Sequence, residues 1–147
     1  MTIAEELANL SRIPLFAVFD EGSVNALAFR SETRVLRTGD VLFRREDVSD
    51  GGFILTAGTI ELYEYQDSGP SLVVHPWTLI GEMALMVEST RPVTAIAAEP
   101  SIVLKIARPQ FLDLMARHPG TAFRVRELLR ERLHEVAQAM SAYAAAV

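Results

Sequence analysis

The segment from Gly81 to Thr94, GEMALMVESTRPVT, places an acid and a base close together in a mostly apolar stretch. Gly81 and Glu82 open what we predict to be a single helical turn. Arg91 follows at the start of an apolar run, directly before Pro92. The first N–H groups of a helical turn lack partners within the turn and therefore favour an anion. Arg91, on the next strand, could bind that anion with its planar fork.

Two interpretations of Glu82 and Arg91 are open at this point. A carboxylate accepts hydrogen bonds from hydroxyl groups, so Glu82 and Arg91 together suit an anion flanked by a hydroxyl, as in a ribose phosphate. Alternatively, Glu82 and Arg91 form an ordinary surface salt bridge beside a tight turn, which is the commoner role of charged pairs in loops.

The composition predicts a single domain over residues 1–147, in which half of the residues are hydrophobic. The 14 basic and 19 acidic residues give a net charge of −5, which argues against a nucleic-acid surface. No cysteine is present for a disulfide or a thiol nucleophile. The N-terminus does not resemble a secretory signal, and no apolar run is long enough to span a membrane. We therefore expect a cytoplasmic protein that binds neither nucleic acid nor membrane.

The hydrophobic pattern changes twice along the chain. Helical spacing occupies most of residues 1–31, with an apolar turn at residues 13–16, and helical spacing returns in residues 108–147 after a break at 118–120. Residues 32–107 contain short β-rich runs separated by glycines and acidic turn residues. The predicted strands lie around Val35 and at residues 41–43, 53–55, 60–63, 72–74, 93–97 and 102–106. Many short strands indicate a sandwich or barrel, and the chain as a whole an α+β domain.

The sequence resembles the cyclic nucleotide-binding domain family, which includes the catabolite activator protein and the regulatory subunits of protein kinase A. The resemblance is carried by residues 13–16, 38–44, 53–62, 81–86 with Arg91, and 111–119. It implies an antiparallel β-roll of the jelly-roll type, flanked by N-terminal and C-terminal helices. Residues 81–94 then correspond to the phosphate-binding cassette of the family.

The resemblance also implies roles for individual residues. Glu82 would bind the ribose 2′-hydroxyl, Arg91 would neutralise the cyclic phosphate, and the backbone of Gly81, Met83 and Ala84 would line the site. Residues 123–135 of the last helix would form a lid or a dimer contact. We therefore expect a stand-alone regulatory domain, not an enzyme and without a cofactor, that binds cAMP or cGMP and signals through its C-terminal helix to an unknown protein partner.

Three positions depart from the family pattern and support an alternative function. Pro92 lacks the N–H that would reach the phosphate. Glu46 and Trp77 stand where glycines are common, and a glycine site that needs positive φ resists a side chain. For Trp77 we favour packing in the core over stacking on a base. The alternative is a degenerate domain that binds no nucleotide and acts as a dimerisation or interaction module.

Other sites are less well supported. A metalloenzyme of the cupin type would need a close histidine pair with a carboxylate, and only His75 and Glu82 approach this arrangement, so we predict no metal site and no catalytic residue. The arginines between residues 124 and 132 alternate with glutamates and indicate a solvated helix face. The apolar residues from Phe123 to Met140 fall at helical spacing beyond the roll. We expect this stripe to form a homodimer.

Overall fold

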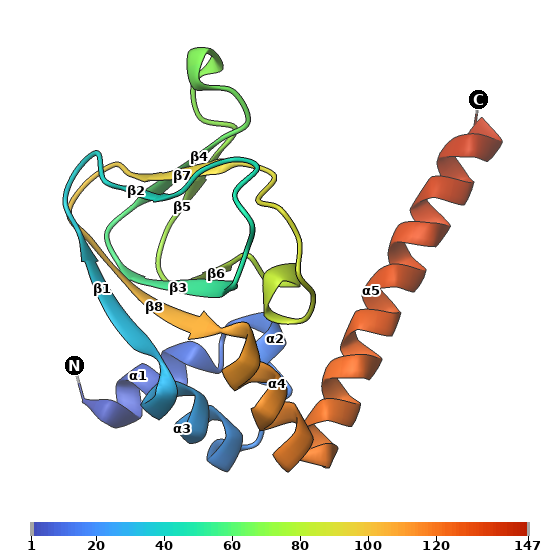
Figure 1. Cartoon of the computed structure of the whole chain (residues 1–147). Coiled ribbons are helices and arrows are strands. Elements are labelled where there is room, and N and C mark those ends of the chain that lie inside the picture. Colours follow the sequence, from blue (N-terminus) through green and yellow to red (C-terminus); the bar gives the residue numbers. More distant parts are fainter. Residues whose placement is uncertain (1, 147) are drawn as a thin grey trace.

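The structure is a computed structural model that describes residues 2–146, apart from the side chains of residues 143, 145 and 146. Strands occupy the middle of the described chain, and helices precede and follow them (Figure 1). The strands are β1 (Glu32–Leu36), β2 (Val41–Phe43), β3 (Gly51–Ala57), β4 (Ile60–Tyr63), β5 (Leu72–Val74), β6 (Thr78–Ile80), β7 (Thr94–Ala97) and β8 (Ser101–Ala107). The helices are α1 (Ile3–Leu10), α2 (Pro14–Ala17), α3 (Glu21–Arg30), α4 (Arg108–Arg117) and α5 (Pro119–Ala146), with short 3-10 turns η1 (Gln66–Ser68) and η2 (Met83–Leu85).

The strands form two four-stranded antiparallel sheets that together make a roll (Figure 1). The first sheet has the order β1-β8-β3-β6 and the second the order β2-β7-β4-β5. The longest pairing joins β3 to β8, from Gly51 opposite Ala107 to Ala57 opposite Ile102. This architecture confirms the predicted α+β class, an antiparallel β-roll flanked by helices at both ends.

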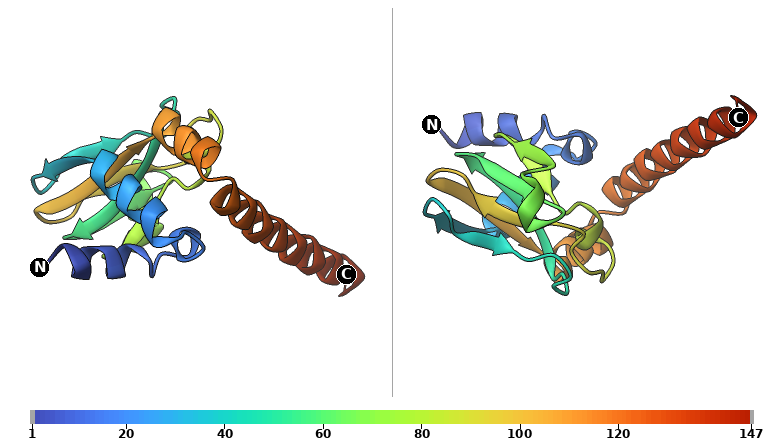
Figure 2. Two further views of the ribbon diagram at one scale, coloured as in Figure 1. Left: turned by 90° about the horizontal axis from the view of Figure 1, so that it is seen from below. Right: turned by 90° about the horizontal axis from the view of Figure 1, so that it is seen from above.

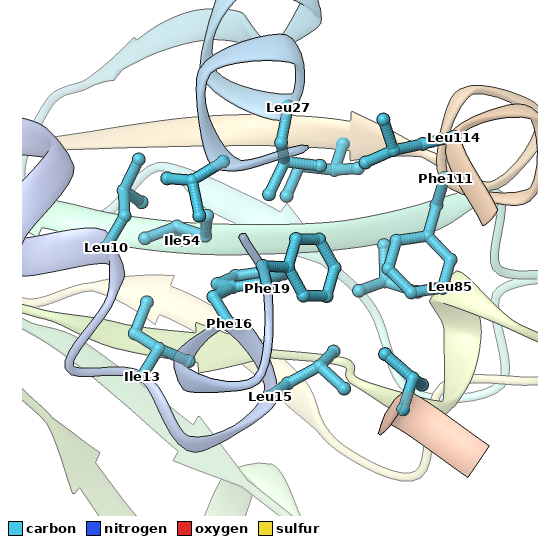
Figure 3. Close-up of a cluster of buried hydrophobic side chains, with 13 residues drawn as sticks. Leu10, Ile13, Leu15, Phe16, Phe19, Leu27, Ile54, Leu85, Phe111 and Leu114 are labelled. Atoms are coloured by element: carbon cyan, nitrogen blue, oxygen red, sulfur yellow. The ribbon is translucent and has the colours of Figure 1, made fainter. Parts of the chain in front are cut away.

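Two apolar clusters hold the fold together. One fills the roll and includes Leu55, Ile60 and Val103, which are fully buried. The other lies between the first sheet and the helices and includes Ile54, Phe16 and Phe111 (Figure 3). Because β3 is buried on both of its faces, its sequence is a continuous apolar run and does not alternate with polar residues.

The helices before the roll begin at residues suited to helix starts. Thr2 and Glu5 form a capping box at the start of α1. The Asp20 carboxylate accepts a hydrogen bond of 2.7 Å from the Ser23 N–H at the start of α3. The apolar segment at residues 13–16 was predicted as a turn, which is wrong, because Pro14 starts the short helix α2. Proline is favourable at this position since its φ already suits a helix.

The structure corrects two predictions about strands. The sequence pattern did not predict β6, a three-residue strand that pairs with β3 so that Ile80 lies opposite Phe53. Gly51 and Gly52 were assigned to a turn, but they begin β3. A Cβ atom on Gly51 would lie 2.1 Å from the carbonyl oxygen of Ile106, so glycine is required here by the close approach of β8.

The base of α5 is fixed to the N-terminal helices by a polar network. The buried hydroxyl of Thr121 lies 3.1 Å from the hydroxyl of Ser23 and donates to the Asp20 carboxylate, also at 3.1 Å. The Nε of Arg124 donates to the carbonyl oxygen of Val18 at 2.6 Å. These contacts set the direction in which α5 leaves the body of the domain.

Beyond its first turns, α5 projects away from the rest of the domain (Figure 2). Ala122 and Val125 are buried, whereas Leu133 is 71% exposed and Met140 is 68% exposed. Leu128 and Leu129 are partly buried against the core, so the predicted apolar stripe is uncovered within one chain mainly from Leu133 onward. Among the described residues, no helix is both long enough and apolar enough to cross a membrane.

Candidate functional site

Gly81 joins β6 to the η2 turn in a conformation that few other residues tolerate. Its φ is +84°, in the left-handed region. A Cβ atom at this position would lie 2.6 Å from Nη1 of Arg91. Both facts require glycine, and they place the backbone of the turn directly against the Arg91 guanidinium.

Arg91 is a buried cation. Only 5% of the residue is exposed, and its guanidinium carbon lies 4.4 Å from the ring centroid of Phe43 and 5.5 Å from that of Phe53. Its Nη2 donates to the carbonyl oxygen of Gly51 at 2.7 Å. Burial lowers the pKa of the guanidinium, and the charge of Asp50 partly opposes this effect. The group nevertheless stays protonated, because arginine is not deprotonated in proteins.

The other terminal nitrogen of Arg91 lacks a partner. Nη1 is buried without a hydrogen bond to any residue that the structure describes. An unpaired buried donor on a cation is costly, and an anionic oxygen placed beside it would satisfy both the hydrogen bond and the charge. The Arg91 guanidinium therefore retains one buried donor that an anionic group such as a phosphate would satisfy.

A strained turn holds the backbone of Arg91. The Arg91 N–H donates to the carbonyl oxygen of Asp47, and the Glu46 N–H donates to the carbonyl oxygen of Arg91, both at 2.8 Å. Glu46 has a φ of 75°, so the predicted need for positive φ at this position is confirmed. The side chain is accommodated in this conformation at a cost in strain. Trp77 has no positive φ, and it packs against the cluster beneath the helices, as favoured from the sequence.

Glu82 faces away from Arg91 toward the C-terminal helix. Its two carboxylate oxygens accept hydrogen bonds from Nη1 of Arg132, at 2.6 Å and 2.5 Å. About a third of each side chain is exposed, at 32% for Glu82 and 35% for Arg132. The alternative of a Glu82–Arg91 surface salt bridge is therefore wrong. Arg132 was assigned to a solvated helix face and to the segment 123–135 that the resemblance predicted as a lid or dimer contact, but no local pattern predicted its pairing with Glu82, fifty positions away.

The remaining cassette residues have different environments. Ala84 is buried, and its N–H donates to the carbonyl oxygen of Gly81 at 3.1 Å. Met83 is 65% exposed, and Pro92 is also exposed. Their backbone roles in ligand binding stay predictions. The structure thus brings Gly81 and Arg91 together and places Glu82 at the outer edge of the turn.

Two other predicted features can be located. Glu127 and Arg130 pair at 3.2 Å, in agreement with a mixed-charge helix face, although Arg124 and Arg132 contact other elements. Within the described residues, no group of three or more His, Asp or Glu side chains is arranged to hold a metal ion.

Comparisons with known proteins agree with this geometry. A family model described as "Cyclic nucleotide-binding domain" matches residues 33–118. The chain is 27% identical over 125 residues to the "Cyclic AMP receptor protein" of Thermus thermophilus. The aligned region covers 83% of this chain and 58% of that protein. It is also 27% identical over 113 residues to "Lysophospholipase nte1" of Aspergillus niger, and this aligned region covers 75% of this chain and 7% of that protein. The chain therefore spans only part of each relative.

Solved structures show the same fold. The N-terminal domain of a transcriptional regulator from Streptomyces coelicolor superposes with a TM-score of 0.83 at 28% identity, covering 89% of this chain and 94% of that one. A cyclic nucleotide-binding-like protein from Brucella abortus superposes with a TM-score of 0.70 at 33% identity, covering 76% of this chain and 98% of that one.

Proposed function

Because this chain belongs to the cyclic nucleotide-binding domain family, we propose that it is a sensor that binds cAMP or cGMP at residues 81–94. In this proposal, Arg91 neutralises the cyclic phosphate and Glu82 accepts a hydrogen bond from the ribose hydroxyl. Binding is then reported through α5 to a partner protein.

The observation that carries this proposal is the unpaired Nη1 of Arg91. A buried guanidinium with one satisfied and one unsatisfied terminal nitrogen is poorly stabilised unless a ligand completes it. The cyclic phosphate of a nucleotide has a single negative charge and two exocyclic oxygens that can accept a hydrogen bond from Nη1. The backbone at Gly81 lies close to this nitrogen, so an anion bound to Nη1 would also lie close to the start of the η2 turn.

The Glu82–Arg132 pair supports signalling through α5. A ribose hydroxyl that bonds to Glu82 must either share the carboxylate with Arg132 or displace it, because Arg132 contacts both oxygens. The pair is partly exposed, so exchange of partners costs little. Ligand binding at the cassette and the position of α5 are thereby linked through one carboxylate.

We propose that the uncovered stripe of α5 pairs with a second copy of the chain. Leu133, Val136 and Met140 are exposed, and with the partly buried Leu129 they follow one another at intervals of four, three and four residues, the repeat of a coiled-coil seam. Two copies related by a two-fold axis would cover both stripes with one self-complementary patch.

Light scattering at micromolar concentration tests the dimer. The wild-type chain should show twice its mass of 16.2 kDa. Leu133→Asp combined with Met140→Asp should reduce the mass to that of one chain, because each carboxylate would be buried without a partner. Both residues are exposed in the single chain, so the variant should keep its fold. A wild-type mass of one chain would refute the dimer.

A second function, an interaction module without a nucleotide, is favoured by two observations. Pro92 has no N–H to donate to a phosphate, and Glu82 already has a charged partner in Arg132. Loss of one charge-assisted hydrogen bond lowers affinity by about ten- to a hundredfold.

Calorimetric titration separates the two functions. A sensor should give saturable heat with cAMP or cGMP at one site per chain. Adenosine and guanosine, which lack the phosphate, serve as controls and should give none. Absence of saturable heat with both cyclic nucleotides would leave the interaction module as the function.

A further inference from the structure

Arg108 connects three parts of the chain at the junction of β8 and α4. Its backbone N–H donates to the carbonyl oxygen of Asp50 at 2.8 Å. Its Nε donates to the carbonyl oxygen of Ala84, in the η2 turn, at 3.0 Å. Its Nη2 donates to the carbonyl oxygen of Ser49 at 2.7 Å and to the Ser49 hydroxyl at 3.0 Å. The guanidinium therefore donates hydrogen bonds from two of its nitrogens to two different segments of the chain.

The first of these segments holds Arg91. Ser49 is 2% exposed, and its N–H donates to the carbonyl oxygen of Ser89 at 2.8 Å, two residues before Arg91. The Ser89 N–H donates in turn to the Ser49 hydroxyl at 3.3 Å. On the other side of Ser49, the carbonyl oxygen of Gly51 accepts from Nη2 of Arg91. A shift of Ser49 would thus displace both the backbone before Arg91 and the acceptor of its side chain.

The second segment is the η2 turn itself. The Ala84 N–H closes the turn by donating to the carbonyl oxygen of Gly81. Ala84 is 3% exposed, so its carbonyl oxygen needs a partner within the protein, and Arg108 provides it. Arg108 thereby ties the turn that presents Gly81 to the loop that holds Arg91.

We propose that Arg108 is a positioning residue for the anion site, which sets the distance between the η2 turn and the Arg91 guanidinium. This inference rests on the proposed function for its effect on nucleotide affinity, but not for its effect on the turn. The role needs arginine and not merely a cation, because one planar group must donate in two directions at once. A lysine at this position would keep the charge and lose the fork.

Hydrogen exchange of the ligand-free protein, followed by mass spectrometry, tests the inference directly. Arg108→Gln and Arg108→Lys should both speed exchange in residues 83–87 by about tenfold or more, because the turn loses its outside anchor. Arg117→Gln is the matched control, since it removes the same charge from the exposed end of α4, where Arg117 pairs with Asp113. Exchange of residues 83–87 should not change in this control.

Calorimetric titration with cAMP and cGMP is the second measurement. Both Arg108 variants should bind about tenfold more weakly than wild type, whereas the Arg117→Gln control should bind as wild type does. The lysine variant carries the test if the glutamine variant does not fold. Full rescue of exchange and affinity by lysine would overturn the positioning role, because charge alone would then suffice. Unchanged exchange in both variants would also overturn it. If the Arg108 variants exchange faster but the wild-type protein binds no nucleotide, the positioning role is supported and the sensor function is refuted.

Discussion

The two charged residues of the cassette lie in contrasting environments, although only nine positions separate them. Arg91 is 5% exposed, lies against two phenyl rings and keeps one nitrogen without a partner among the described residues. The Glu82 side chain is 32% exposed and pairs with a residue from another element. A buried cation gains much from an added anion, whereas an exposed carboxylate exchanges partners at small cost. Arg91, the buried end of the site, is thus suited to binding an anion. Glu82, the exposed end, is suited to changing its partner when a ligand binds.

The largest expected effect comes from removing the buried end. Arg91→Met should weaken cAMP or cGMP binding by more than about a hundredfold, because the phosphate loses its charged partner. The melting temperature should fall little or rise, since an apolar side chain replaces an incompletely paired buried cation. Arg37→Met, whose side chain is 91% exposed in wild type, is the control for the loss of charge. Equal affinities for the two variants would disprove the role of Arg91.

The exposed end should respond with smaller changes of opposite sign. Glu82→Gln should weaken nucleotide binding by about tenfold, because the hydroxyl loses a charged acceptor. Arg132→Gln should tighten binding by up to about fivefold, since Glu82 no longer has a competing partner and exposed pairs are worth up to about 1 kcal/mol. Calorimetry measures both. Weaker binding by Arg132→Gln would contradict competition and indicate that Arg132 itself contacts the ligand.

The smallest expected effect concerns the turn that supports Arg91. Glu46→Gly should raise the free energy of unfolding by about 0.5–1 kcal/mol, because glycine adopts the φ of 75° without strain. Urea unfolding measures this change. Glu88→Gly, at an exposed position without positive φ, should instead destabilise the protein slightly. Nucleotide affinity should not change with Glu46→Gly, because only the backbone of residue 46 contacts Arg91. Destabilisation by Glu46→Gly would show that its side chain has a stabilising role.

The features predicted from the sequence are those determined by local pattern. The apolar runs predicted β3 and β8 because both strands are long and rich in apolar residues, and β3 is buried at successive positions. The strand β6 was missed because Thr78 leaves it only two consecutive apolar residues, whereas the equally short strands β2 and β5 are apolar throughout. The positive φ at Glu46 was anticipated because a glycine is common at this point in the family, and the turn geometry is kept despite the side chain.

The partners of Glu82 and Ala84 could not be predicted from local sequence pattern. Arg132 and Arg108 reach them from elements that are distant in sequence, and each arginine stands in a local context that suits an ordinary surface residue. Only the assembled fold determines where α4 begins relative to the η2 turn and in which direction α5 leaves the domain. The partners of charged side chains depend on these directions, so sequence spacing alone cannot assign them.

In the proposed signalling, α5 would act as a lever arm that turns about its junction with α4 at His118. Arg132 lies about 20 Å from the start of this helix and Ala146 about 40 Å, at 1.5 Å of rise per residue. For rotation about the junction, a displacement of about 1 Å where Arg132 meets Glu82 becomes about 2 Å at the far end. In the proposed signalling, α5 would amplify the movement of Arg132 relative to Glu82, and a partner bound near the tip would experience about twice the movement that occurs at the cassette.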